Sequence, residues 1–152
     1  RRQRQMCIRD RVEDDPAHAE IAIRNLEFCR VANRIRHVSD GQAALEYLHR
    51  QGEYRDPQAN PRPHLILLDL RLPKADGLEV LKHVKSDPGL RSIPVVILTT
   101  SSAESDILRA YDSHASSYLV KPVDFDKFMS LMEAFGFYWV VWNCYPHQRK
   151  DP

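Results

Sequence analysis

The sequence lacks the features that mark several broad classes of protein: long hydrophobic runs, paired cysteines and a strong charge of one sign. Only 3 residues are cysteines, Cys7, Cys29 and Cys144; their odd number and wide spacing argue against a disulfide framework and fit a reducing cytoplasm. The formal net charge is +1, which gives no reason to expect binding to nucleic acid or to a membrane surface. No apolar stretch approaches the roughly 18 residues of a transmembrane helix, and no apolar segment follows the basic start to make it a secretion signal.

Two further absences bear on the kind of site that the chain can form. Its 7 histidines occur singly, without the spacing of metal ligands. No glycine-rich or Ser/Thr-rich phosphate loop follows the first expected strand, which disfavours a flavin-binding module. What is present is typical of a soluble globular protein: 152 residues, 43% hydrophobic and 28% charged, enough for one domain and too few for two.

Strand-like and helix-like segments alternate along the chain. Short β-type runs predict strands at 35–38, 65–68, 94–100 and 117–120. Amphipathic or capped segments predict helices at 16–29, from Gly41, at 78–84, at 104–112 and from about Asp124 onward, and 51–63 is expected to be a proline-rich loop. This alternation implies parallel pairing through right-handed crossovers, so a single doubly wound α/β domain is predicted.

The stretch from His64 to Gly77, H-L-I-L-L-D-L-R-L-P-K-A-D-G, is the centre of this pattern. Its unbroken apolar run predicts a strand buried on both faces, as in the middle of a parallel sheet. Asp69 follows that strand, and Pro73 and Asp76-Gly77 open a loop. Open α/β sheets place their chemistry at this end of the strands, so Asp69 is the leading candidate for a functional residue.

Other chemistry-bearing side chains also follow strand-like segments. They are Glu13, Asp14, Thr99 and Lys121. The carboxyl ends of parallel strands lie at one edge of a sheet, so these residues are expected to converge on Asp69. Crowded carboxylates favour Mg²⁺, and a lysine and a hydroxyl nearby would suit an incoming anion. Together they point to phosphoryl transfer, which depends on positioning and charge neutralisation.

The same residues carry a resemblance to a known family. V-E-D-D-P, L-I-L-L-D-L-R-L-P-K-A-D-G, I-P-V-V-I-L-T-T and S-Y-L-V-K-P, in this order, resemble a bacterial response-regulator receiver domain over roughly residues 12–135. The proline-rich loop, L-R-S-I-P-V-V-I-L-T-T, K-P-V-D-F and the late F-Y-W also resemble the stand-alone regulators associated with phytochrome-type histidine kinases. The resemblance implies a flavodoxin-like, five-stranded parallel sheet in the order 2-1-3-4-5 with five helices.

The resemblance also implies a role for each site residue. Asp69 would accept a phosphoryl group from a kinase phosphohistidine, with Lys121 pairing with that group. Asp14 would bind Mg²⁺ directly, Glu13 mostly through water, and Arg71 through its backbone carbonyl. The implied partner is a histidine kinase, and the implied function is that of a signalling switch rather than an enzyme.

The remaining implied roles concern the switch and the lifetime of its signal. Thr99 would move toward the phosphoryl oxygen and let the ring of Tyr118 turn inward, remodelling the surface of the last helix and strands. The peptide bond from Lys121 to Pro122 would be cis, which proline permits. Arg71 and Ser101 sit where their side chains could modulate attack of water on the acyl phosphate.

Two positions depart from the pattern of the family. His114 stands where glycine is usual; if that turn needs a positive φ, histidine costs about 1 kcal/mol. The first strand, normally apolar and central, is replaced by Met6 to Arg11, in which Ile8 is the main apolar residue, and buried unpaired charges are costly. One interpretation of the abrupt change at Val12 is that residues 1–11 are not native; the predicted receiver domain then spans 12–146, with a tail at 147–152.

The aromatic segment from Phe135 to Tyr145 has two interpretations. It could be a long last helix that completes the core, or a partner or homodimer surface formed by Tyr138, Trp139 and Trp142, residue types enriched at interfaces.

Two alternative functions were weighed against a phosphoacceptor switch. A haloacid-dehalogenase-like phosphatase also uses an aspartyl nucleophile and Mg²⁺, but it needs a second aspartate where Arg71 stands. A degenerate receiver that acts as a phosphorylation-independent interaction module is the stronger alternative, because a defective first strand would misplace Glu13 and Asp14.

Overall fold

The computed structural model of the chain describes residues 8–12, 16–17, 20, 24, 36–72 and 76–138. The strands are β1 (Ile8–Val12), β2 (His37–Val38), β3 (Leu65–Leu68), β4 (Val95–Thr99) and β5 (Ser117–Val120). The helices are α2 (Gly41–Leu48), α3 (Gly77–Ser86), α4 (Glu104–Asp112) and α5 (Phe125–Phe137), with a 3₁₀ turn, η1 (Gly52–Tyr54). Residues 16, 17, 20 and 24 are helical; the rest of the helix predicted at 16–29 lies outside the described residues.

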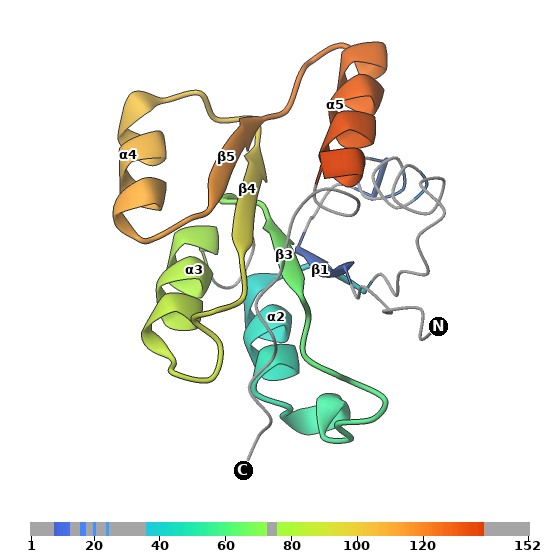
Figure 1. The fold of residues 1–152 in the computed structure, drawn as a ribbon, viewed down its shortest axis with the longest axis vertical. Coiled ribbons are helices and arrows are strands. Elements are labelled where there is room, and N and C mark those ends of the chain that lie inside the picture. Colours follow the sequence, from blue (N-terminus) through green and yellow to red (C-terminus); the bar gives the residue numbers. More distant parts are fainter. Residues whose placement is uncertain are drawn as a thin grey trace.

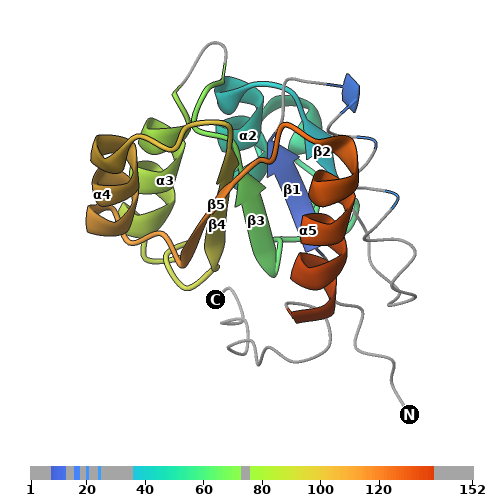
Figure 2. The same ribbon diagram turned by 90° about the horizontal axis from the view of Figure 1, so that it is seen from above.

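The five strands form one sheet in the order β2-β1-β3-β4-β5, and every neighbouring pair is parallel. Leu68 at the end of β3 lies opposite Val12 of β1 and Ile97 of β4, and Thr99 lies opposite Val120 of β5. Figure 2 shows α3 and α4 on one side of the sheet and α5 on the other, as in a doubly wound fold. The predicted class, a parallel sheet covered by helices, is therefore confirmed.

The core lies around β3 and β4, whose residues are buried along their whole length. Ile66, Leu68, Val95 and Ile97 join the apolar residues of α2, α3 and α4 in one cluster. Because side chains alternate across a strand, the residues between them face the other side, which α5 covers with Phe128, Met132 and Phe135. Burial on both faces explains why these two segments are unbroken apolar runs in the sequence.

Three of the helices have an aspartate as their N-cap residue. The Asp40 carboxylate accepts a hydrogen bond from the N–H of Ala43 at 2.8 Å, Asp76 accepts one from Leu78 at 3.1 Å, and Asp124 accepts from Asp126 and Lys127. Such caps satisfy N–H groups that have no partner within the helix. They explain why the predicted starts at Gly41 and near Asp124 are correct.

Some predicted boundaries differ from the structure. α3 runs two residues past the predicted Val84, to Ser86, and the loop at 51–63 contains the short turn η1. β2 has only two residues, since it pairs with β1 alone at the edge of the sheet. Within the described part of the chain, no helix combines the length and the apolar character needed to cross a membrane.

The first strand occupies the central position despite its charged residues. β1 pairs with β2 on one side and with β3 on the other, so the segment Ile8–Val12 takes the place predicted for Met6 to Arg11. Its register with β3 is irregular between Ile8 and Arg11. The backbone therefore completes the sheet, with an irregularity in the strand whose sequence is atypical.

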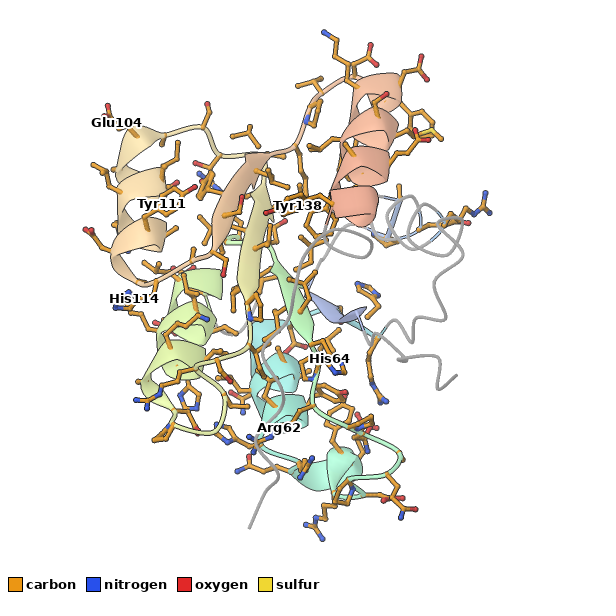
Figure 3. The ribbon with its side chains drawn as sticks, in the orientation of Figure 1. Arg62, His64, Glu104, Tyr111, His114 and Tyr138 are labelled. Atoms are coloured by element: carbon orange, nitrogen blue, oxygen red, sulfur yellow. The ribbon has the colours of Figure 1, made fainter. Side chains whose placement is uncertain are left out.

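His114 has the positive φ that makes histidine costly in its turn. Its φ is +69°, and its N–H donates to the carbonyl of Tyr111 at 2.9 Å, directly after α4. Figure 3 shows His114 at the end of that helix. A side chain with a Cβ is strained in this conformation, whereas glycine is not.

We therefore expect the substitution His114→Gly to stabilise the protein. The free energy of unfolding, measured by urea denaturation, should rise by about 0.5 to 1 kcal/mol. The matched control is Ser113→Gly, whose position has an ordinary φ of −92° and should show no gain. Equal effects of the two substitutions would contradict strain at His114.

Candidate functional site

Asp69 lies at the carboxyl end of β3 with both carboxylate oxygens in contact with donors. Oδ1 accepts a hydrogen bond from the backbone N–H of Arg71 at 3.1 Å, and Oδ2 accepts one from the Lys121 ammonium at 3.0 Å. The Asp69 and Lys121 side chains are only 8% and 3% exposed. A buried carboxylate and a buried ammonium are each costly alone, so their contact neutralises both.

Lys121 reaches Asp69 because the ladder between β4 and β5 continues past the strands. The N–H of Lys121 donates to the carbonyl of Thr99 at 2.7 Å, which fixes the backbone of Lys121 beside the end of β4. Its side chain then crosses the end of β4 to the neighbouring strand β3. Residues 52 positions apart in sequence thus meet because parallel strands end at one edge.

A second network links Thr99 to Tyr118 through Ser101. The fully buried Thr99 accepts a hydrogen bond at Oγ1 from the N–H of Ser101, at 3.5 Å. The Tyr118 hydroxyl donates to the carbonyl of Ser101 at 2.9 Å, and the Ser101 hydroxyl donates to Asp106 at 2.6 Å. Burial raises the pKa of the Tyr118 phenol, which strengthens the preference for the protonated, donating form. A displacement of Thr99 or Ser101 would therefore alter the hydrogen bond that the Tyr118 hydroxyl makes.

Gly77 and Asp106 are site residues that the sequence pattern did not single out. A Cβ on Gly77 would lie 2.1 Å from the carbonyl oxygen of Asp69 and 2.6 Å from Cα of Leu70. The N–H of Gly77 also donates to the Leu70 carbonyl at 3.0 Å. The start of α3 therefore packs directly on the backbone that carries Asp69. The pair Asp76-Gly77 was recognised only as a turn, and nothing in the sequence of α4 marks Asp106.

An open groove of about 620 Å³ lies beside the site. It is lined by Leu70, Arg71, Leu72, Asp76, Leu78, Asp106 and Arg109. Leu70 and Arg71, which follow Asp69 in the chain, and Asp106, which accepts the Ser101 hydroxyl, therefore line the same groove.

Comparison with known proteins decides the family. A family model described as the response regulator receiver domain matches residues 11–133. The chain belongs to this family. The match covers the strands that end directly before Asp69 and Lys121.

The relatives include two curated proteins of similar length. The chain is 44% identical over 135 residues to the probable methanogenesis regulatory protein FilR2 of Methanothrix harundinacea, covering 89% of this chain and 84% of FilR2. It is 39% identical over 129 residues to the response regulator Rcp1 of Synechocystis sp., covering 85% of this chain and 86% of Rcp1.

Solved structures of receiver-domain proteins share the fold. The Mn²⁺-bound form of Rcp1 has a TM-score of 0.84 at 38% identity and covers 89% of this chain and 95% of its own. The phosphorylated cyanobacterial phytochrome response regulator RcpA has a TM-score of 0.88 at 38% identity, with 93% and 99% covered. The predicted resemblance to phytochrome-associated regulators is therefore confirmed.

The structure brings together part of the predicted site. Asp69, Lys121 and the backbone of Arg71 are in contact, and Thr99 and Tyr118 are linked through Ser101. Glu13 and Asp14 lie outside the described residues, directly after the end of β1. Their predicted approach to Asp69 stays a prediction.

One implied feature is wrong. The resemblance implied a cis bond between Lys121 and Pro122, but no peptide bond in the described part of the chain is cis. The trans form of a proline bond is favoured by roughly 0.5 to 1 kcal/mol, so cis needs a structural reason. Here the trans chain already lets Lys121 bond to Thr99 through its N–H and to Asp69 through its ammonium.

The described residues supply some, but not all, of the oxygen ligands that a divalent cation would need at this site. Asp69 supplies a carboxylate at the rim of the sheet, and the adjacent backbone supplies carbonyl oxygens, which are ligands that Mg²⁺ accepts. Within the described residues, no group of three His, Cys, Asp or Glu side chains forms a metal site. The other predicted ligands, Glu13 and Asp14, lie outside the described residues.

The predicted aromatic surface is only partly described. Tyr138 follows α5 (Figure 3) and its side chain is exposed. Trp139 and Trp142 lie outside the described residues. Both interpretations of the segment therefore stay predictions.

The substitution Gly77→Ala tests whether the start of α3 packs directly on the backbone of Asp69. The added methyl group would overlap backbone atoms, and overpacking of this kind costs about 1 to 3 kcal/mol or more. We expect the free energy of unfolding, measured by urea denaturation, to fall by about 2 kcal/mol or more.

The matched control is Gly89→Ala. There the nearest atom is Nη1 of Arg62, at 2.7 Å, the far end of a flexible side chain that can move. Gly89→Ala should lower the free energy of unfolding by no more than about 1 kcal/mol. A Gly77→Ala protein as stable as the control would contradict the packing of α3 on Asp69.

Proposed function

We propose that this receiver domain is a phosphoacceptor switch. Asp69 receives a phosphoryl group from the phosphohistidine of a histidine kinase, with Mg²⁺, and the change of surface that follows controls protein partners. The observation that carries the proposal is the Asp69 carboxylate at the carboxyl edge of the sheet, held by the Lys121 ammonium at 3.0 Å and the Arg71 N–H at 3.1 Å. A nucleophile, a cation and a backbone donor at one point suit phosphoryl transfer.

Asp69 is the nucleophile in this mechanism. A carboxylate oxygen attacks the phosphorus, and the bond from phosphorus to the kinase imidazole nitrogen breaks as the acyl phosphate forms. Lys121 then turns from the carboxylate to the phosphoryl oxygens, whose negative charge it stabilises. The Arg71 N–H orients the Asp69 carboxylate, and the packing of Gly77 keeps the Asp69 backbone in place during the reaction.

The proposed metal ligands are Glu13, Asp14, Asp69 and the backbone carbonyl of Arg71. When bound there, Mg²⁺ neutralises charge on the phosphoryl group. The Mn²⁺-bound form of the related Rcp1 supports a divalent cation in this family. In this chain, β1 ends at Val12, opposite Leu68, which favours the approach of residues 13 and 14 to Asp69.

The proposed switch uses the network that ends at Tyr118. A phosphoryl oxygen on Asp69 would attract the Thr99 hydroxyl, whose present contact with the Ser101 N–H is long, at 3.5 Å. Ser101 carries the hydrogen bond from Tyr118, so Thr99 and Tyr118 would shift together. Tyr118 lies in β5, the edge strand, and its movement would alter the surface next to α4 and α5.

The proposed partner is a phytochrome-type histidine kinase. The related RcpA is a phytochrome response regulator and was solved in a phosphorylated form. Other solved relatives are bacteriophytochrome response regulators, with up to 42% identity. These relationships support a kinase of that type for this chain.

One observation favours a second candidate function. The register between β1 and β3 is irregular between Ile8 and Arg11, in the strand that leads to Glu13 and Asp14. If this irregularity misplaced the two acids, the metal site would be weak and the chain would act as a phosphorylation-independent interaction module.

Phosphorylation by a small phosphodonor separates the two candidates. Incubated with acetyl phosphate and Mg²⁺, the wild-type chain should gain the mass of one phosphoryl group, and chelation of Mg²⁺ should prevent the gain. Asp69→Asn should gain none, because an amide is not a nucleophile toward phosphorus. Intact-protein mass spectrometry measures each outcome.

The matched control is Asp87→Asn, which changes the same side chain at the end of α3, where its carboxylate accepts the N–H of Gly89 at 2.7 Å. This variant should be labelled like the wild type. Label on the Asp69→Asn chain would contradict the assigned acceptor. An unlabelled wild type would support the interaction module.

A further inference from the structure

Two histidines lie together at the end of the domain opposite Asp69. His49 is the residue that ends α2, and His83 lies in the last turn of α3. Figure 1 shows the two helices side by side, and they are in contact. Helices in this fold run back from the carboxyl edge of the sheet, so their C-terminal ends lie at the opposite edge from the phosphoacceptor.

The two imidazole rings face each other through their Nε2 atoms. These atoms form a hydrogen bond, the ring centroids are 4.7 Å apart, and the ring planes are perpendicular. A neutral imidazole has one donor and one acceptor nitrogen, so one ring donates and the other accepts. His83 is exposed and His49 is half-buried, so an ion from solvent can reach the point where the two nitrogens meet.

The electrostatic surroundings favour a cation at this point. Both histidines are at the C-terminal ends of helices, which carry the partial negative charge of the helix dipole. The lysine in the same turn of α3, Lys85, directs its ammonium to the carbonyls of Arg91 and Ile93, at 3.1 and 2.6 Å. Its charge is thus held by the turn that follows α3.

We propose that His49 and His83 bind a divalent transition-metal cation such as Zn²⁺, Ni²⁺ or Cu²⁺. Each ring contributes Nε2; the ring that now donates takes up a proton on Nδ1 from solvent and releases the one on Nε2, so both rings stay neutral. Ligand nitrogens of a tetrahedral zinc lie roughly 3.3 Å apart, and small rotations of these accessible side chains make that space. Water completes the coordination.

The nature of the ligands separates this site from the acidic one at Asp69. Imidazole suits Zn²⁺, Ni²⁺ and Cu²⁺, whereas Mg²⁺ prefers oxygen ligands and keeps its waters. In the described part of the chain, no third His, Cys, Asp or Glu joins the pair. The bound cation links the ends of α2 and α3 and stabilises the folded chain by mass action.

Calorimetric titration of the full chain with Ni²⁺, in excess Mg²⁺, tests the proposal. We expect one ion per chain with micromolar affinity, unaffected by Mg²⁺. His49→Gln and His83→Gln should each weaken binding by about tenfold or more, because each removes one of the two protein ligands. His114→Asn removes an exposed histidine elsewhere, keeps a residue that tolerates positive φ, and should bind like the wild type.

Spectroscopy of the wild type provides a test that does not depend on variants. Bound Cu²⁺ should show magnetic coupling to two imidazole nitrogens in pulsed electron paramagnetic resonance. A single nitrogen, no binding at micromolar Ni²⁺, displacement by Mg²⁺, or unchanged affinity in either glutamine variant would overturn the proposal. Each readout is independent of phosphorylation at Asp69.

Discussion

The contact between Lys121 and Asp69 is the interaction on which the site depends. It joins the end of β5 to the end of β3 across β4, with both side chains buried. Each charge alone in this position would be costly, and the contact offsets much of that cost. The contact requires the strands to be parallel and to end together, and the apolar runs of β3 and β4 provide that frame. Gly77 completes it by letting α3 begin against the Asp69 backbone.

Features that depend on local pattern were predicted well from the sequence. The apolar runs at 65–68 and 94–100 located the strands β3 and β4, and Asp69 and Lys121 followed from their positions at strand ends. Contacts that arise only when elements pack could not be read in advance. The approach of Gly77 to Asp69 and the bond from Ser101 to Asp106 depend on where α3 and α4 lie over the sheet. The cis bond at Pro122 was wrong because it rested on resemblance, and a proline bond alone does not determine its isomer.

The first strand takes its place in the sheet although its sequence is unusual for a central strand. Its sequence, I-R-D-R-V, has only Ile8 and Val12 as apolar residues, far fewer than β3 or β4, yet β1 lies between β2 and β3 with parallel ladders on both sides. Strand pairing is made by main-chain groups, which every residue here supplies. The match to the receiver-domain family begins at residue 11, near the end of this strand. The irregular register upstream, between Ile8 and Arg11, therefore falls mostly before the matched region.

The proposed metal site requires the acids that follow β1 and the acid that follows β3 to lie together. The most direct measurement is Mg²⁺ binding followed by amide chemical shifts in the wild type and in the Asp14→Asn variant. We expect the amides of Asp69 and Arg71 to shift in the wild type, with saturation at millimolar Mg²⁺. Asp14→Asn should weaken this binding by about tenfold or more, because a direct carboxylate ligand is lost. A wild type with no Mg²⁺-dependent shift around Asp69, or a variant that binds equally well, would contradict the proposed metal site.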